Sequence, residues 1–183
     1  MELYSEDVLL SLLVNEDTRE LGFKALVSNY SERLYWHIRR IVLVHEDADD
    51  ILQETFIKAW QNLDSFRGDS RILTWLYRIA TNESLGHLRK FKDKYHLEID
   101  NPEISIINTL ESDSYFDGDE AVIKLQKAIL SLPEKQRIVF LMKYYDEMKY
   151  IEISKVLDTS VGGLKASYHH AVSKIEEFLK GSD

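Results

Sequence analysis

The side chains best suited to bind another molecule lie near the C-terminus, where a polar turn separates two segments with helical spacing. The turn is Asp158-Thr159-Ser160, whose short polar side chains can supply an N-cap oxygen that accepts from a free amide group of the second helix. Apolar residues of that helix recur every three or four positions, which leaves an opposite face of small, polar and basic residues. Such a face can enter a DNA groove and reach phosphates and base edges. It consists of Gly162, Gly163, Lys165, Ala166, Ser167, His169, His170, Ser173 and Lys174.

Two interpretations of this segment remain open on its residues alone. It is either a DNA-binding helix-turn-helix or an ordinary helical hairpin whose second helix has a solvated face. Lys165 fits a phosphate ligand and equally a solvated lysine, and His169-His170 also fits a pair of surface imidazoles.

The residues that usually carry catalysis form no known motif in this sequence. There is no cysteine, and the six histidines lack the spacing of a metal-binding motif. A glycine-rich phosphate loop is also absent. We therefore expect no catalytic residue, no metal and no cofactor, and the chain is predicted not to be an enzyme. A metal-dependent hydrolase built on His45, Asp50 and Glu54 is kept as a third alternative.

The elements that position these residues are predicted to be helices. A chain of 183 residues with 44% hydrophobic residues suits one domain or two small ones, and 7 glycines and 2 prolines leave little turn material for a sheet. The spacing predicts an all-α fold, with a bundle in the first half and four short helices after about residue 121. Residues 1–17 are predicted to add a helix that packs on the first domain. The apolar stripes are assigned Leu21, Ala25, Tyr30, Leu34, Ile38, Ile41, Ile51, Thr55, Ile57, Trp60, Ile72, Trp75, Leu76, Ile79, Leu88, Val122, Leu125, Ile129, Ile138, Leu141, Met142, Tyr145, Val161, Leu164, Tyr168, Val172, Ile175 and Leu179.

The net charge of −9 is concentrated in one stretch. Residues 1–92 carry 12 basic and 15 acidic side chains, residues 93–120 carry 1 and 9, and residues 121–183 carry 10 and 8. The middle stretch is therefore predicted to be an acidic linker between two domains. Residues 71–92 carry five basic side chains against Glu83 alone, so a basic segment exists within an acidic protein.

The sequence shows neither a membrane span nor a secretion signal. No stretch approaches roughly 18 apolar residues, and the acidic N-terminus lacks the basic start of a signal peptide. We expect a cytoplasmic protein without membrane insertion.

Both halves of the sequence resemble the sigma factors of bacterial RNA polymerase that form the extracytoplasmic-function group. The resemblance runs from about residue 20 to residue 180 and leaves the linker unmatched. Ser131–Phe140 followed by Tyr150–Ala171 is similar to the fourth conserved region of the group. Asp47–Trp60 resembles its polymerase-binding helix. Three stretches resemble the promoter-melting segment of the group, namely Phe66–Ser70, Thr74–Asn82 and Leu88–Lys90.

The resemblance implies a factor that binds core RNA polymerase, through its beta-prime and beta subunits, and directs it to promoter DNA. Residues 1–92 would bind the enzyme and recognise and melt the minus-10 element, residues 93–120 would be the linker, and residues 121–183 would recognise the minus-35 element. The group also implies an anti-sigma factor as a partner. The implied polymerase-binding residues are Asp49, Asp50, Gln53, Glu54 and Lys58. The implied minus-10 residues are Phe66, Arg67, Gly68, Asp69, Ser70, Arg78, Asn82, Arg89 and Lys90. The implied minus-35 residues are Ser160, Gly162, Gly163, Lys165, Ala166, Ser167, His169, His170 and Lys174.

The C-terminal helix departs from the group, whose members often carry arginine after the position of Lys165. This chain has Ser167, His170 and Val172 there, so Lys165 and Lys174 supply the full cations of that region. Fewer cations predict a shallow salt dependence and weak binding of promoter duplex by the isolated chain. The alternative from another class is a stand-alone helix-turn-helix regulator that binds DNA as a dimer without polymerase.

Overall fold

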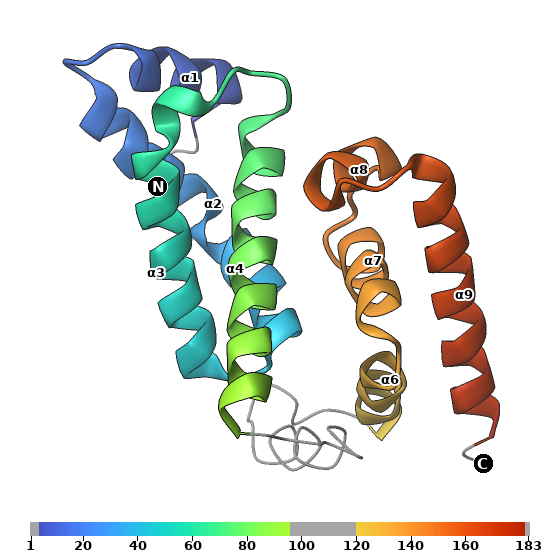
Figure 1. The fold of residues 1–183 in the computed structure, drawn as a ribbon. Helices are drawn as coiled ribbons and strands as arrows, with labels where there is room; N and C mark the ends of the chain where they lie inside the picture. Colours follow the sequence, from blue (N-terminus) through green and yellow to red (C-terminus); the bar gives the residue numbers. More distant parts are fainter. Residues whose placement is uncertain (1–3, 96–119, 182–183) are drawn as a thin grey trace. The chain divides into compact units, whose positions relative to one another are not determined.

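The computed structural model describes residues 4–95 and 120–181, which form helices and no β-strand (Figure 1). The all-α prediction is confirmed. Most of the predicted linker, residues 96–119, lies outside the described residues. The elements are α1 (Glu6–Val14), α2 (Arg19–Val42), α3 (His45–Gln61), a 3-10 helix (Leu63–Ser65), α4 (Ile72–Tyr95), α6 (Glu120–Leu130), α7 (Glu134–Tyr144), α8 (Tyr150–Leu157) and α9 (Val161–Lys180).

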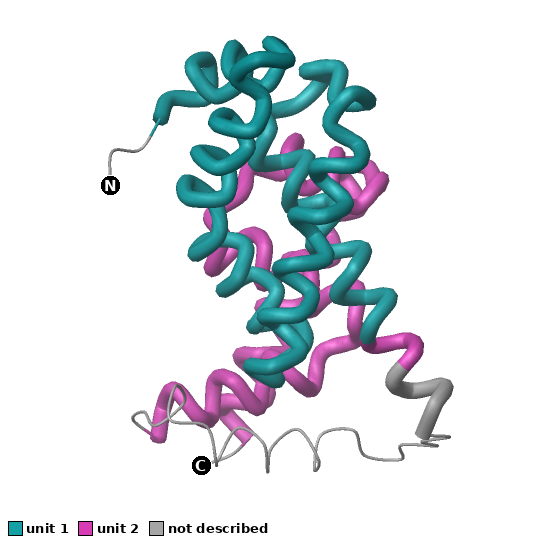
Figure 2. Tube along the Cα trace, turned by 90° about the vertical axis from the view of Figure 1, so that its left-hand side faces the viewer, with its two compact units in different colours: residues 1–87 teal, residues 88–183 magenta. Residues whose placement is uncertain are grey.

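The chain divides into two compact units, residues 1–87 and residues 88–183 (Figure 2). The division lies within α4. The first unit contains α1, α2, α3 and most of α4, and the second contains α6 to α9.

The first unit has its core where α2 packs against α1 and α3. Leu26, Leu34 and Ile38 of α2 are fully buried, as are Ile72 and Leu76 of α4. A buried hydrogen bond of 2.9 Å between His37 Nε2 and the Thr81 hydroxyl joins α2 to α4.

The predicted N-terminal helix is confirmed as α1, which buries Leu9 and Leu13. It crosses α2 at Gly22, where a side chain would not fit, because a Cβ atom there would lie 2.8 Å from Cβ of Leu12. The glycine therefore permits the close approach of the two helices.

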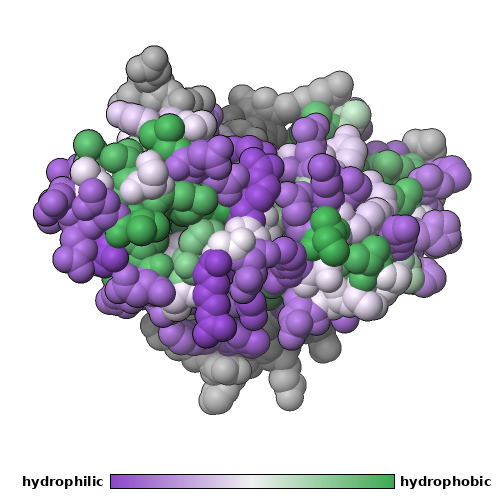
Figure 3. Space-filling view, turned by 90° about the horizontal axis from the view of Figure 1, so that it is seen from above, coloured by the Kyte–Doolittle hydropathy of each residue, from purple (hydrophilic) through white to green (hydrophobic). Residues whose placement is uncertain are grey.

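Four residues assigned to the apolar stripes lie on the surface instead. The exposed fractions are 55% for Leu21, 51% for Ile57, 42% for Trp60 and 45% for Val122. In α3 the buried line runs through Ile51, Thr55 and Ala59, and neither Ile57 nor Trp60 shares that side of the helix. In α2 the close approach to α1 is at Gly22, and the side chain of the preceding Leu21 is exposed. Hydrophobic residues also reach the surface in the view of Figure 3.

The second unit packs α9 against α6, α7 and α8. Its core includes Ile129, Ile138, Met142, Ile153 and Leu164, each at most 2% exposed. Pro133 lies directly before α7, where its fixed φ suits the start of a helix.

The predicted turn and cap between α8 and α9 are confirmed. Asp158 ends α8 in the left-handed region with φ 48°, and the Ser160 hydroxyl accepts from the Gly163 amide at 3.2 Å. On α9 the fully buried line passes through Leu164 and Ala171, whereas Val172 is half-buried.

Candidate protein and nucleic-acid interfaces

The outward side of α3 carries a line of exposed residues. Gln53 and Glu54 each lie three or four positions from Asp50 and from Ile57, Trp60 lies three positions further on, and all five residues are exposed. We call these five residues the α3 outer face. They lie on the exposed side of α3, because the other side of the helix is buried through Ala48, Ile51, Thr55, Phe56 and Ala59.

The α3 outer face combines acidic groups with a fixed aromatic ring. Trp60 packs edge-on against Phe23 of α2 with ring centroids 5.0 Å apart, and Phe23 packs in turn against Phe56 at 6.3 Å. A rigid aromatic beside polar groups on an exposed surface is typical of protein-binding sites. The sequence interpretation missed Ile57 and Trp60 because it assigned them to the core.

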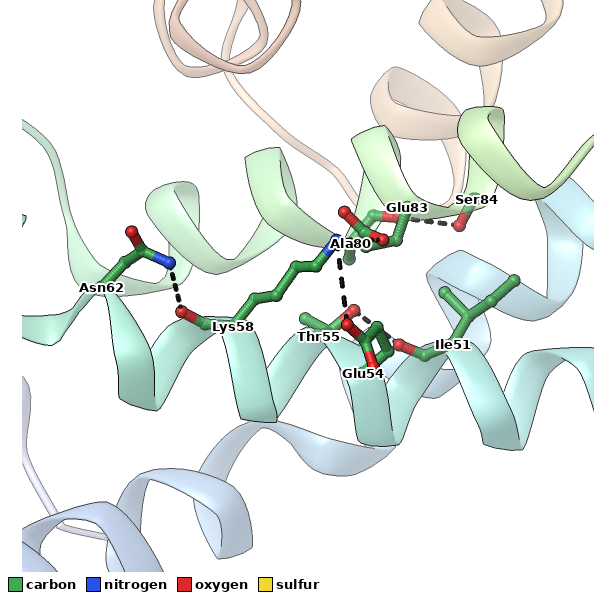
Figure 4. Close-up of polar contacts among 8 residues, drawn as sticks. All are labelled: Ile51, Glu54, Thr55, Lys58, Asn62, Ala80, Glu83 and Ser84. Atoms are coloured by element: carbon green, nitrogen blue, oxygen red, sulfur yellow. Dashed lines mark hydrogen bonds and ion pairs between the residues drawn. The ribbon is translucent and has the colours of Figure 1, made fainter. Parts of the chain in front are cut away.

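Lys58, one of the residues implied to bind polymerase, is already engaged in ion pairs. Its Nζ lies 2.7 Å from Glu83 of α4 and 3.8 Å from Glu54 (Figure 4). The hydrogen bond from Lys58 to Glu83 raises the pKa of the ammonium group, with Glu54 adding to the effect. Lys58 thus joins α3 to α4 within the first unit.

Asp49 is also engaged, and it is half-buried. Its carboxylate lies 3.5 Å from Nε2 of His45, and Nδ1 of the same ring lies 2.8 Å from the Tyr35 hydroxyl. In the described part of the chain, no group of three or more His, Asp and Glu side chains could hold a metal ion. The hydrolase alternative, which needs such a group around His45, therefore finds no site there.

The Phe66–Ser70 loop connects the 3-10 helix to α4. The Phe66 ring lies tilted against Trp75, with centroids 5.2 Å apart. Trp75, assigned to the core from the sequence, is half-buried in this contact. Gly68 has φ +75°, a left-handed conformation that glycine adopts without strain. Arg67, Gly68 and Asp69 are exposed.

The predicted minus-10 residues of α4 extend away from this loop along one side of the helix. Arg78, Asn82 and Arg89 are exposed and lie four and seven positions apart, so they share a face. Lys90 is exposed next to Arg89. The loop and α4 together present a basic surface with polar groups between the cations.

The predicted minus-35 face of α9 is largely accessible. The exposed members are Ser160, Gly162, Lys165, Ala166, His169, His170 and Lys174, while Gly163 and Ser167 are half-buried. The Gly163 amide donates to the Ser160 hydroxyl within the first turn of α9. The His169 and His170 rings lie 6.0 Å apart.

Two residues that sequence reasoning missed accompany Lys165. The Nζ atoms of Lys143 on α7 and Lys165 on α9 lie 5.4 and 6.0 Å from the ring centroid of Tyr150, the first residue of α8. Burial raises the pKa of Tyr150 above its ordinary value. A tyrosine hydroxyl is protonated at neutral pH even without this shift, so it can donate a hydrogen bond. Two cations and a phenol from three helices can together bind phosphates. The sequence carries no signal for this cluster, because it depends on how α7, α8 and α9 pack.

Comparison with known proteins identifies both units. The family model for Sigma-70 region 2 matches residues 26–94, and that for Sigma-70, region 4 matches residues 123–175. The chain is 35% identical over 168 residues to the ECF RNA polymerase sigma factor SigW of Bacillus subtilis, an alignment covering 87% of this chain and 89% of the relative. This chain belongs to the extracytoplasmic-function family of RNA polymerase sigma factors.

A second relative agrees with this family, and two solved structures share the fold. The sigma factor is 30% identical over 175 residues to the RNA polymerase sigma-H factor of Pseudomonas aeruginosa, covering 87% and 86% of the two chains. Its fold resembles RpoE of Bartonella quintana, solved with the anti-sigma factor NepR, at a TM-score of 0.67, 23% identity and coverage of 86% and 96%. It also resembles CnrH, solved with the cytosolic domain of CnrY, at a TM-score of 0.69, 20% identity and coverage of 97% and 98%.

The family settles the main alternatives raised by the sequence. As a sigma factor the protein binds core RNA polymerase and directs promoter-specific initiation, and it is not itself an enzyme. A stand-alone regulator would leave the region 2 match over residues 26–94 without a role. Within residues 4–95 and 120–181, no helix is both long and apolar enough to cross a bilayer.

Proposed function

We propose that residues 1–92 of this sigma factor bind core polymerase and open the minus-10 element, and that residues 121–183 recognise the minus-35 element. In this proposal the acidic segment 93–120 links the two functions. The polymerase at which the factor acts is in the bacterial cytoplasm, and we place the factor there. The beta-prime and beta subunits are the proposed contacts on the enzyme.

The proposed polymerase contact is the α3 outer face. The observation that carries it is the exposed line of Asp50, Glu54, Ile57 and Trp60, because an aromatic ring held against Phe23 loses little conformational freedom on binding. Asp49 and Lys58, also implied by the resemblance, lie beside this line and keep partners within the first unit. We assign them a supporting role at the edge of the contact.

The proposed minus-10 contact consists of the Phe66–Ser70 loop and the basic face of α4. Opening a duplex requires that an unstacked base be held and that cations neutralise the separated strand. Phe66, Arg67, Gly68, Asp69 and Ser70 supply the loop. The strand would then follow Arg78, Asn82, Arg89 and Lys90, all of which are exposed on α4.

The proposed minus-35 contact is α9 with the Lys143–Tyr150 cluster. Lys165 begins the recognition face, and Lys143 and Tyr150 lie beside it, where duplex phosphates would pass. The remaining members of the face are Ser160, Gly162, Gly163, Ala166, Ser167, His169, His170 and Lys174. Few of these side chains carry a full positive charge, so we expect promoter binding to depend on the holoenzyme.

An anti-sigma factor is the proposed regulatory partner. One solved structure with this fold contains the sigma factor RpoE bound to the anti-sigma factor NepR, and another contains CnrH bound to the cytosolic domain of CnrY. A partner of this class would act by covering the α3 outer face or the DNA-binding surfaces.

Reconstituted transcription tests the proposed function. Purified core polymerase with the full chain should start RNA at a two-element promoter, and Glu54→Lys should weaken binding to core. Glu32→Lys is the matched control, because Glu32 is an exposed acidic residue of α2 that is not part of the α3 outer face. Equal loss of core binding in both variants would contradict the assignment. Tight binding of promoter duplex by the isolated chain at physiological salt would contradict the dependence on holoenzyme.

A further inference from the structure

The start of α4 is held by a residue from the other end of the first unit. One carboxylate oxygen of Glu6, Oε1, accepts from the Ile72 amide at 2.7 Å, and the other, Oε2, accepts from Arg71 Nε at 3.0 Å. Glu6 lies in the first turn of α1 and is half-buried. These bonds connect residues more than sixty positions apart, directly after the Phe66–Ser70 loop.

This contact supplies an acceptor that the cap residue of α4 itself lacks. The Trp75 amide donates to the Arg71 carbonyl at 3.1 Å, so Arg71 occupies the cap position of α4. An arginine side chain has no acceptor with which to cap a helix. The first turn of α4 also contains no acidic residue to complement the positive end of the helix dipole. The Glu6 carboxylate provides both the acceptor and the negative charge.

The position of Glu6 is itself fixed by the packing of α1. Leu9 and Leu13 are buried, and α1 approaches α2 so closely that a Cβ atom at Gly22 would lie 3.0 Å from the Leu12 carbonyl carbon. At the start of α1, the Asn29 side chain donates to the Tyr4 carbonyl at 2.7 Å and accepts from its amide at 3.3 Å. The contacts of α1 with α2 therefore fix the position of the Glu6 carboxylate at the start of α4.

We propose that Glu6 is a positioning residue for promoter opening. It fixes the end of the Phe66–Ser70 loop that enters α4, so that the loop is already shaped to hold an unstacked base. Without this contact, the end of the loop next to α4 would be ordered only when the DNA strand binds. The free energy that this ordering costs would weaken the affinity for the strand. The inference rests on the proposed role of the loop, and it adds that α1 takes part in promoter opening without touching DNA.

The test measures strand capture by holoenzyme assembled from core polymerase and the full chain. The probe is a fluorescent oligonucleotide with the non-template minus-10 strand of a promoter at which wild-type holoenzyme starts RNA. We expect Glu6→Ala to weaken its binding about tenfold, corresponding to about 1.4 kcal/mol. Glu6→Gln keeps an oxygen that can accept from the Ile72 amide, so it should restore much of the binding.

Control variants separate positioning from general damage. Glu16→Ala removes an exposed acidic residue between α1 and α2 and should leave strand binding unchanged. Gly22→Ala should displace α1 and weaken strand binding even though Glu6 is present. Affinity for core polymerase and for minus-35 duplex should stay at wild-type values in Glu6→Ala.

Two results would overturn the inference. One is wild-type strand binding by Glu6→Ala in the same assay in which Phe66→Ala loses it, which would leave the loop's proposed function intact. The other is a parallel loss of core affinity and strand binding in Glu6→Ala, which would show a general structural role. If Phe66→Ala also bound the strand normally, the proposed function of the loop would fail as well.

Discussion

Substitution of Ile57 directly tests whether the α3 outer face binds polymerase, because Ile57 is an apolar residue whose side chain is exposed to solvent in the free protein. Complete burial of an isoleucine side chain contributes about 1.5–3 kcal/mol. Since 51% of Ile57 is exposed, its further burial under polymerase would contribute about 1 kcal/mol. We therefore expect Ile57→Ala to weaken the affinity for core polymerase about fivefold.

The matched control is Leu21→Ala on α2. Leu21 is also aliphatic and is 55% exposed, but it lies outside the α3 outer face. The assay is competition between labelled wild-type protein and each unlabelled variant for core polymerase, with thermal melting to confirm that both variants fold. Equal affinities for the two variants would refute the assignment of Ile57 to the polymerase contact.

Three further predictions concern the pairs and caps described above. Ser160→Ala removes the acceptor for the Gly163 amide and should speed hydrogen exchange at that amide about fivefold, for a cap of about 1 kcal/mol; unchanged exchange would contradict the cap. The hydrogen bond to Glu83 raises the pKa of Lys58 above its ordinary value of 10.5. The ion pair therefore stabilises the folded state fully below pH 10.5, and this stabilisation is lost as the pH rises through the pKa of Lys58 in the folded protein. The difference in unfolding free energy between wild type and Lys58→Met should accordingly shrink from pH 7 to strongly alkaline pH, and a constant difference would argue against the ion pair. Lys143→Gln should lower the slope of log affinity against log salt for minus-35 duplex in the holoenzyme by about one, whereas Lys180→Gln should leave it unchanged; equal slopes would exclude Lys143 from the phosphate contact.

Local patterns in the sequence were sufficient to predict most of the helices. The turn and the N-cap oxygen within Asp158-Thr159-Ser160, and the N-terminal helix, are predictable because each depends on neighbouring residues. The motifs that resemble known sigma factors likewise predict the positions of α3, the Phe66–Ser70 loop and α9 in the sequence.

The surfaces were harder to predict because apolar character alone does not say which side of a helix is covered. Ile57 and Trp60 were assigned to the core, although the buried line of α3 passes through Ala59 instead. The hydrogen bond from Ile72 to Glu6 and the contact of Lys143 with the Tyr150 ring depend on how the helices pack in the folded protein. No periodicity in the sequence reports such distant pairs.

The ion pair between Lys58 and Glu83 has a thermodynamic consequence for initiation. It links the helix proposed to meet the enzyme with the helix proposed to meet the opened strand (Figure 4). If attachment to the enzyme strengthens capture of the strand through this link, the captured strand must strengthen attachment to the enzyme by the same factor, because coupling free energies are reciprocal. Release of the factor after initiation would then become easier once the strand has left α4.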